Sequence, residues 1–322
     1  MRTMSRRTAE AVASRYGLGP PVRDPVYADR GELGRVWRLD TDRGSWAVKE
    51  ADQLVPEVDA AADVAFQLAA AAAGVPLPRP VRTPAGAVLV PGVEVASAAA
   101  VLRVYAWAEL HKNEVVTAAE LGTVTALLHR IGHPAAGPVN AWFAEPLGAD
   151  GWRELLASAQ RAGAWWAAVL ERWLPELIEA DYLVTPPDDA RTTTCHLDVN
   201  IENVRRGGDG GVVVLDWENS GPGQPERELA AILFDVDTDL GLDDARASYV
   251  AYREAGGPAE LTGPPDFSTA IAVQGHLLRV YGDRALGGHE PEDRQRAERR
   301  LRQLLRQPLT PAHVSHLLRA LR

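Results

Sequence analysis

The chain has 322 residues, a length typical of two domains or of one fold divided by a cleft. Hydrophobic residues make up 46 % and charged residues 24 %, with no apolar run long enough to cross a bilayer. The formal net charge of −10 argues against a protein that binds nucleic acid with its whole surface. It favours a cationic small partner, although acidity also simply keeps a protein in solution.

The N-terminal residues and the single cysteine bear on localisation. The basic opening MRTMSRRTAE lacks the apolar segment of a secretory signal or a membrane anchor. Cys195 allows no internal disulfide, which suits a reducing compartment, and we expect it to be a small buried residue rather than a nucleophile. These features predict a cytoplasmic protein with no membrane partner.

The first third of the chain predicts a small sheet with one helix. Residues 26–50 are typical of short strands separated by turns, and the run SWAVKE places Lys49 at a strand end. Alanine-rich residues 56–73 predict a helix that stops at Gly74. Two further strand-like runs follow at 85–90 and 99–107.

The remainder is predicted to be mostly helical, starting with 118–131, whose apolar residues recur on one helical face. Further helices are expected over 151–161, 164–180, 225–234, 243–255, 266–282, 291–306 and 311–321. One β-like segment, 192–219, interrupts them, and its glycine-rich turn at 207–211 predicts a hairpin. The layout is α+β: a smaller lobe over 1–109, a hinge near 105–110 and a larger lobe over 110–322, with the cleft between them as ligand site.

Four polar residues stand in an informative order. Lys49 ends a strand, Asp198 and Asn203 precede the hairpin, and Asp216 follows its second strand. Phosphoryl transfer requires a cation for the phosphates, a carboxylate that positions the attacking hydroxyl, and oxygen ligands for magnesium. Each residue alone is more often a turn residue or an exposed side chain, so the hypothesis depends on the ordered set.

The same segments carry a family resemblance. HLDVNIEN resembles the H-x-D-x-x-x-x-N catalytic loop, and VLDWEN the metal loop, of aminoglycoside phosphotransferases and related small-molecule kinases. GELGRVWRL, WAVKE, GVPLPRPV, RVYAWAEL and LLHRIG are also similar, so the resemblance covers about residues 25–235. It implies a bilobal protein-kinase-like fold and an ATP- and Mg²⁺-dependent kinase that phosphorylates a hydroxyl of a small molecule.

The resemblance also implies catalytic and metal roles. Asp198 would be the catalytic base toward the substrate hydroxyl, and His196 would hold the loop in shape. Asn203 and Asp216 would ligate Mg²⁺.

Nucleotide contacts follow from the same comparison. Lys49 would contact the α- and β-phosphates, paired with an acid of the first helix, Asp63 by spacing or else Glu57. Adenine would lie at the hinge against backbone groups near Ala106 and Ala108.

Three differences from the motifs of related kinases narrow the class of enzyme. The glycine loop, with Gly31 and Gly34, lacks the full G-x-G-x-x-G, although it would still lie over the nucleotide. The metal loop reads DWE in place of DFG and no A-P-E segment follows, which argues against a protein kinase. Glu228 stands where the family usually has aspartate.

The acceptor is expected to be an antibiotic, aminoglycoside-like or another natural product, so that phosphorylation gives resistance. A metabolite kinase of choline, homoserine or sugar type is the alternative, because the motifs serve the phosphate and not the acceptor. A non-catalytic nucleotide-binding protein would have lost one of Lys49, Asp198, Asn203 or Asp216, and all four are present.

Other features have plainer interpretations. His129 is expected to be satisfied by a carbonyl or a helix dipole. The acids of FDVDTDLGLDDA would either line a pocket for a cationic substrate or cap a helix near Leu242. The arginine-rich 294–306 segment predicts an amphipathic helix rather than a nucleic-acid site. Most tryptophans between 142 and 173 are expected in the core, with one or two able to stack on a substrate ring.

Overall fold

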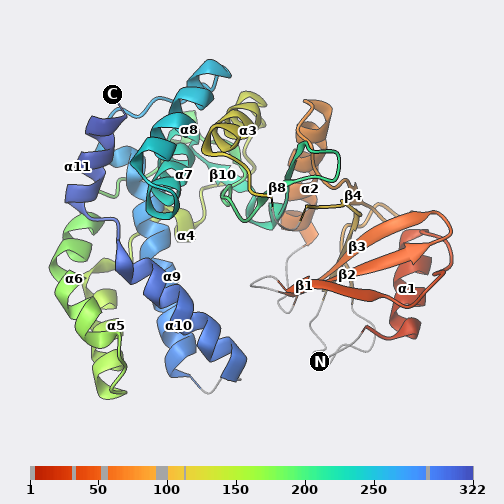
Figure 1. The fold of residues 1–322 in the computed structure, drawn as a ribbon, viewed down its shortest axis with the longest axis horizontal. Coiled ribbons are helices and arrows are strands. Elements are labelled where there is room, and N and C mark those ends of the chain that lie inside the picture. Colours follow the sequence, from red (N-terminus) through yellow and green to blue (C-terminus); the bar gives the residue numbers. More distant parts are fainter. Residues whose placement is uncertain are drawn as a thin grey trace. The chain divides into compact units, whose positions relative to one another are not determined.

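The computed structural model describes residues 4–30, 34–51, 57–91, 101–111, 114–287 and 291–321. They fall into two compact units (Figure 1). The first contains Met1–Val116 and Ile201–Ser220, and the second contains Thr117–Asn200 and Gly221–Arg322. The hairpin segment, which the sequence analysis assigned to the 110–322 lobe, is thus part of the first unit. None of the helices within the described ranges is long and apolar enough to span a bilayer.

The first unit is built on an antiparallel sheet. Its strands are β1 (Val26–Arg30), β2 (Gly34–Thr41), β3 (Gly44–Ala51), β4 (Pro80–Val81), β5 (Val90–Pro91) and β6 (Val101–Ala106). The order is β1-β2-β3-β6-β4, and β5 also pairs with β6. The strand expected at 85–90 is wrong: Thr83 and Ala87 close a hydrogen-bonded turn there, and only Val90 and Pro91 pair.

Two helices and a hairpin complete the first unit. Helix α1 (Arg6–Tyr16), which the sequence analysis did not anticipate, is capped by the Ser5 side chain and buries Val12 and Tyr16 against the sheet (Figure 1). Helix α2 (Glu57–Ala72) is within one residue of its expected bounds. Strands β8 (Val204–Arg206) and β9 (Val212–Val214) form the expected hairpin, so that prediction is confirmed.

The second unit is mostly helical. Its helices are α3 (Ala118–Arg130), α4 (Ala141–Ala144), α5 (Gly148–Arg161), α6 (Ala167–Asp181), α7 (Pro225–Asp239), α8 (Leu242–Glu254), α9 (Ser268–Leu286), α10 (Pro291–Arg306) and α11 (Pro311–Ala320). Trp152 and Trp166 are buried in one core cluster, whereas Trp142 and Trp173 are half-buried and Trp165 is 43 % exposed. The expectation that most of these tryptophans lie in the core therefore holds for only two of the five. Helix α10 buries Leu301 and Leu305 and keeps its arginines outward, which confirms an amphipathic helix.

The acid-rich segment differs from its expected form. Helix α7 continues to Asp239, so Asp235 and Asp237 lie within a helix instead of ahead of one. Asp237 pairs with His313 of α11 at 2.7 Å, and Asp243 lies in the first turn of α8, where it pairs with Arg246. These acids therefore support helix ends and helix contacts within the second unit.

Helices α3 and α8 approach closely at Gly122. A Cβ added there would lie 2.0 Å from the Ser248 carbonyl oxygen, closer than any packed structure allows. We expect Gly122→Ala to lower the free energy of unfolding by about 1–3 kcal/mol because the helices must separate. The measurement is the urea midpoint, with Thr123→Ala, an exposed neighbour, as control. A midpoint equal to that of the parent would contradict the close packing.

Candidate functional site

Lys49 lies between two acids of the segment that follows the hairpin. Its ammonium forms ion pairs with Asp216 and, at 2.8 Å, with Glu218. Burial lowers the pKa of Lys49, but the Glu218 and Asp216 carboxylates outweigh it and hold that pKa above its usual value. The first unit thus joins the expected phosphate-binding cation to the expected metal-binding segment.

Trp217 explains why both acids point to the same side. Its indole is 2 % exposed, donates to the Val214 carbonyl and packs edge-on against Phe66 of α2. Asp216 takes a left-handed backbone conformation at φ 61°, unusual for a residue with a side chain. Anchoring the tryptophan therefore turns its two acidic neighbours toward Lys49.

Glu218 is a site residue that the sequence analysis missed. Its carboxylate accepts a hydrogen bond from the Tyr105 hydroxyl at 2.9 Å and pairs with Lys49. Burial raises the pKa of Glu218, yet Lys49 and Arg103 keep it below its ordinary value. Burial and the nearby Glu218 charge raise the pKa of Asp216 to about 6, against the opposing effect of Lys49. The acid two residues after Asp216 in DWE was the available signal.

Asp63 has a different partner from the one expected. Its carboxylate pairs with Arg103 of β6 at 2.7 Å and accepts a bond from Gln67, so the predicted Asp63–Lys49 pair is wrong. Both partners of this ion pair are at most 3 % exposed, and burial raises the pKa of Asp63 to about 7 while Arg103 opposes the rise. Arg103 lies opposite Lys49 in strand register and is the cation that meets α2. The Glu57 side chain, the reserve partner, lies outside what the structure describes.

The base of the hairpin joins Asn203 to the metal segment. The Leu215 amide donates to the Asn203 carbonyl at 2.8 Å, directly beyond the Val204–Val214 pair. Asn203 and Asp216 therefore flank the end of one short ladder. Amide and carboxylate oxygens are the ligands that Mg²⁺ prefers, and a loop with two acids and one lysine has negative charge to offer, so these residues fit such an ion.

Residues 196–200 of the expected catalytic loop belong to the second unit, and residues 201–203 to the first. The loop leaves β7 (Thr193–Cys195), which pairs with β10 (Gly221–Gly223). His196 is fully buried, and the Asn200 amide donates to the Asp198 carboxylate at 2.9 Å. Cys195 is 1 % exposed and burial raises the pKa of its thiol well above the ordinary value, which confirms a core residue.

Glu228 of α7 fixes this loop through hydrogen bonds. One carboxylate oxygen accepts the Leu197 amide, and the other bonds His129 at 2.8 Å. Leu197 has a φ of 62°, a strained conformation for a branched side chain, and its amide is fixed by this bond. Burial raises the pKa of Glu228, but His129 and the Leu197 amide lower it overall.

His129 is the next member of this hydrogen-bond network. The prediction that a carbonyl or a helix dipole satisfies it is wrong. Its second ring nitrogen lies 2.9 Å from the Tyr252 hydroxyl, which also accepts the Ala259 amide. With that hydroxyl donating to Nδ1, Nε2 carries the proton given to Glu228. His129, Cys195 and Glu228 place their ligand atoms within 4.8 Å of one another. Because both Glu228 oxygens are already used, we assign them to a hydrogen-bond network rather than a metal centre.

The hinge strand is held on both sides within the first unit. The Ala106 amide donates to the Arg79 carbonyl and the Trp107 amide to the Ser45 carbonyl. These two amides are therefore committed to neighbouring backbone, and adenine binding near Ala106 and Ala108 stays a prediction. Gly34 begins β2 opposite Ala51, whereas Gly31 lies outside the described residues.

The sequence of the chain matches the profile described as the phosphotransferase enzyme family over residues 27–264. The chain belongs to the phosphotransferase enzyme family. Among curated proteins, none matches it significantly. The matched segment contains Lys49, the loop with Asp198 and the acids Asp216 and Glu218.

Solved structures of phosphotransferases share this fold. A spectinomycin phosphotransferase with ADP and spectinomycin covers 100 % of this chain and 99 % of its own at 14 % identity and a TM-score of 0.67. A microcompartment-associated aminopropanol kinase covers 94 % and 95 % at 16 % identity and 0.61. Amicoumacin kinase hAmiN with AMP-PNP and Ca²⁺ covers 89 % and 90 % at 14 % identity and 0.57. The expected α+β protein-kinase-like fold is confirmed.

Within this phosphotransferase the structure brings Lys49 to Asp216 and joins Asp216 to Asn203. Asp198 and His196 lie in the second unit, five residues or so upstream of Asn203 in the chain. Their convergence with Lys49 stays a prediction.

Replacing Arg103 by Met tests the buried ion pair. We expect Arg103→Met to cost about 3–5 kcal/mol of unfolding free energy, because Asp63 is left buried without its cation. The double variant Arg103→Met with Asp63→Leu should recover most of the loss, since an apolar pair needs no partner charge. Urea unfolding measures both. Equal loss in the single and double variants would contradict the pairing.

Proposed function

We propose that this phosphotransferase transfers the γ-phosphate of ATP to a hydroxyl of a small molecule. The observation that carries the proposal is the Lys49 ammonium held by the two acids of the DWE segment within one unit. Such a cation beside metal-binding carboxylates meets the electrostatic needs of a triphosphate. A chain that merely bound a polar ligand would not need this pairing.

The phosphate side of the reaction is assigned to the first unit. Lys49 would leave its acids to contact the α- and β-phosphates, and Asn203 and Asp216 would hold Mg²⁺. The ion supplies neutralising charge to the phosphate oxygens when bound. The Ala106 carbonyl and Ala108 amide would bind adenine. Gly31 and Gly34 would lie over the nucleotide, and the Asp63–Arg103 pair would fix α2 beside this site.

The acceptor side is assigned to the second unit. Asp198 would accept the hydrogen bond of the attacking hydroxyl and take its proton as the oxygen attacks phosphorus. The Asn200 amide orients that carboxylate, and His196 braces the loop from inside. Residues 1–109 would form the nucleotide lobe and 110–322 the lobe that binds the acceptor, with both lobes needed for turnover.

The acceptor we propose is an antibiotic, modified so that it no longer acts. The compared proteins named for spectinomycin and amicoumacin support this class. The aminopropanol kinase supports a second candidate, a small amino alcohol of metabolism. An amine in the acceptor would suit the net charge of −10 in either case.

An acceptor screen distinguishes the two candidates. Purified protein with ATP and Mg²⁺ is incubated with aminocyclitol and peptide-like antibiotics and with amino alcohols, choline, homoserine and sugars. Mass spectrometry then detects the gain of one phosphate. Phosphorylation of the metabolites alone would reject the antibiotic role, and no phosphorylated product from any class would reject the proposal.

Replacing Asp198 tests the base. We expect Asp198→Asn to reduce kcat by about 10²- to 10⁴-fold with little change in nucleotide affinity, because the amide cannot take the hydroxyl proton. Asp189→Asn, an exposed acid in the same unit, is the matched control. A kcat within about tenfold of the parent would show that another group acts as base.

Replacing Lys49 tests the phosphate contact. We expect Lys49→Met to weaken binding of a non-hydrolysable ATP analogue roughly ten- to a hundredfold, as loss of a charged hydrogen-bond donor predicts. Isothermal titration calorimetry measures the affinity, with Arg82→Met, an exposed cation of the same unit, as control. An unchanged affinity for the analogue in Lys49→Met would show that the nucleotide does not bind at Lys49.

A further inference from the structure

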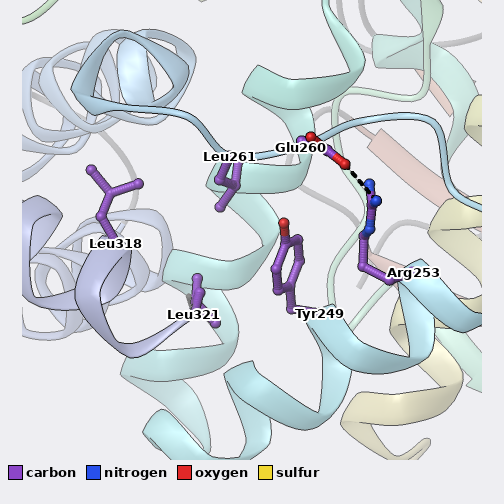
Figure 2. Close-up of a pocket in the computed structure, with 6 residues that line it drawn as sticks. All are labelled: Tyr249, Arg253, Glu260, Leu261, Leu318 and Leu321. Carbon is purple, nitrogen blue, oxygen red and sulfur yellow. Dashed lines mark hydrogen bonds and ion pairs between the residues drawn. The ribbon is translucent and has the colours of Figure 1, made fainter.

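A pocket in the second unit is lined by residues outside the catalytic loop (Figure 2). It has a volume of about 290 Å³ and lies between the C-terminal half of α8, the segment at 260–261 and the end of α11. The lining residues are Tyr249, Arg253, Glu260, Leu261, Leu318 and Leu321. This volume is at the lower end of the range for small-ligand sites, so the occupant is a small molecule.

The lining combines an apolar wall with one charged group that can take a ligand. Three leucines face the Tyr249 ring, and the Arg253–Glu260 ion pair closes the opposite side (Figure 2). Arg253 is committed twice, to Glu260 at 2.5 Å and to the Ala259 carbonyl at 3.0 Å. The described contacts of Glu260 use only one of its carboxylate oxygens. The second oxygen is an acceptor for a cation.

These features select the ligand chemistry. A carboxylate oxygen beside apolar walls favours a protonated amine over a neutral or anionic group, because the charge-assisted bond is the stronger one. The Tyr249 ring offers a cation–π contact to the same ammonium, and the leucines offer surface to an apolar body. An anion would be repelled by Glu260, and Arg253, the cation of the lining, is already bonded to Glu260 and to the Ala259 carbonyl.

We propose that this pocket binds a small hydrophobic amine through Glu260, and that occupancy acts on the catalytic loop through the Tyr252–His129–Glu228 network. Binding of the amine in this pocket does not depend on the proposed reaction. The functional meaning of the effect on the loop rests on the proposed role of Asp198.

A continuous series of hydrogen bonds connects the pocket to the loop. Arg253 donates to the Ala259 carbonyl, and the Ala259 amide donates to the Tyr252 hydroxyl at 2.9 Å. From Tyr252 the series passes through His129 to Glu228, which binds the Leu197 amide next to Asp198. Every link lies within the second unit.

Packing makes the link between Ala259 and Tyr252 stiff. A Cβ added at Gly257 would lie 2.3 Å from the Tyr252 ring, so this backbone rests directly on the ring. Tyr252 is fully buried and shares a core cluster with Leu261 and Leu321 of the pocket wall. An amine bound to Glu260 therefore restricts the motion of residues 257–261, which rest on Tyr252, and with it that of the strained Leu197.

Binding is tested first, with 3-phenylpropylamine as probe and calorimetry on the full chain without nucleotide. We expect saturable binding that Glu260→Gln weakens roughly tenfold and that Glu179→Gln, an exposed acid on α6, leaves unchanged. The isosteric anion 3-phenylpropanoate should not bind. Absence of saturable amine binding, equal binding to Glu260→Gln, or equal binding of the anion would each overturn the site.

The connection to the loop is tested by amide hydrogen exchange. We expect the probe to slow exchange at residues 196–198 in the parent chain. Tyr252→Phe, which removes the bridging hydroxyl but lies outside the pocket lining, should keep amine binding and lose the slowing. Unchanged exchange in the parent, or slowing that persists in Tyr252→Phe, would overturn the connection. Neither assay involves phosphoryl transfer, so failure of the proposed reaction would leave both results interpretable.

Discussion

Two cations, Lys49 and Arg103, face each other in register on adjacent strands of the first unit. Like charges in that position repel and destabilise a sheet unless acids compensate them. Asp63 from α2 and Asp216 and Glu218 from the segment after the hairpin supply the compensation. Two segments far apart in sequence, α2 and the segment after the hairpin, are thereby held to the sheet. The site is positioned by this neutralisation of charge as much as by apolar packing.

In the second unit Glu228 has a comparable positioning role. Its buried carboxylate binds a backbone amide and a histidine at once, and neither bond is replaceable by water at 3 % exposure. The left-handed Leu197 would relax without that support. A glutamate reaches one carbon further than the family's usual aspartate, and His129 and Tyr252 fill the space behind it. The loop geometry is therefore set by buried groups of α3, α7 and α8.

The sequence predicts the fold class, the hairpin and nearly every helix, because apolar periodicity and turn residues are local signals. It also predicts that Lys49 and Asp216 belong together, since their order along the chain matches a known family. The sequence does not predict the partners of Asp63 and His129, because strand register and helix packing determine them. Helix α1 was overlooked because a basic opening was considered only as a targeting segment. Glu218 was overlooked because the metal-loop resemblance gives a role only to the first acid of DWE.

The buried Asp63–Arg103 pair has a consequence for control of the enzyme. In protein kinases the lysine of the third strand pairs with an acid of the first helix, and displacement of that helix turns catalysis off. Here the helix is fastened to a different strand by a pair that water does not reach. Swinging α2 outward would leave the Arg103 charge in the core without its partner and would take Phe66 away from Trp217, which orients the two acids of Lys49. Helix α2 is therefore a fixed support of the site, held by a pair of charges that the core encloses.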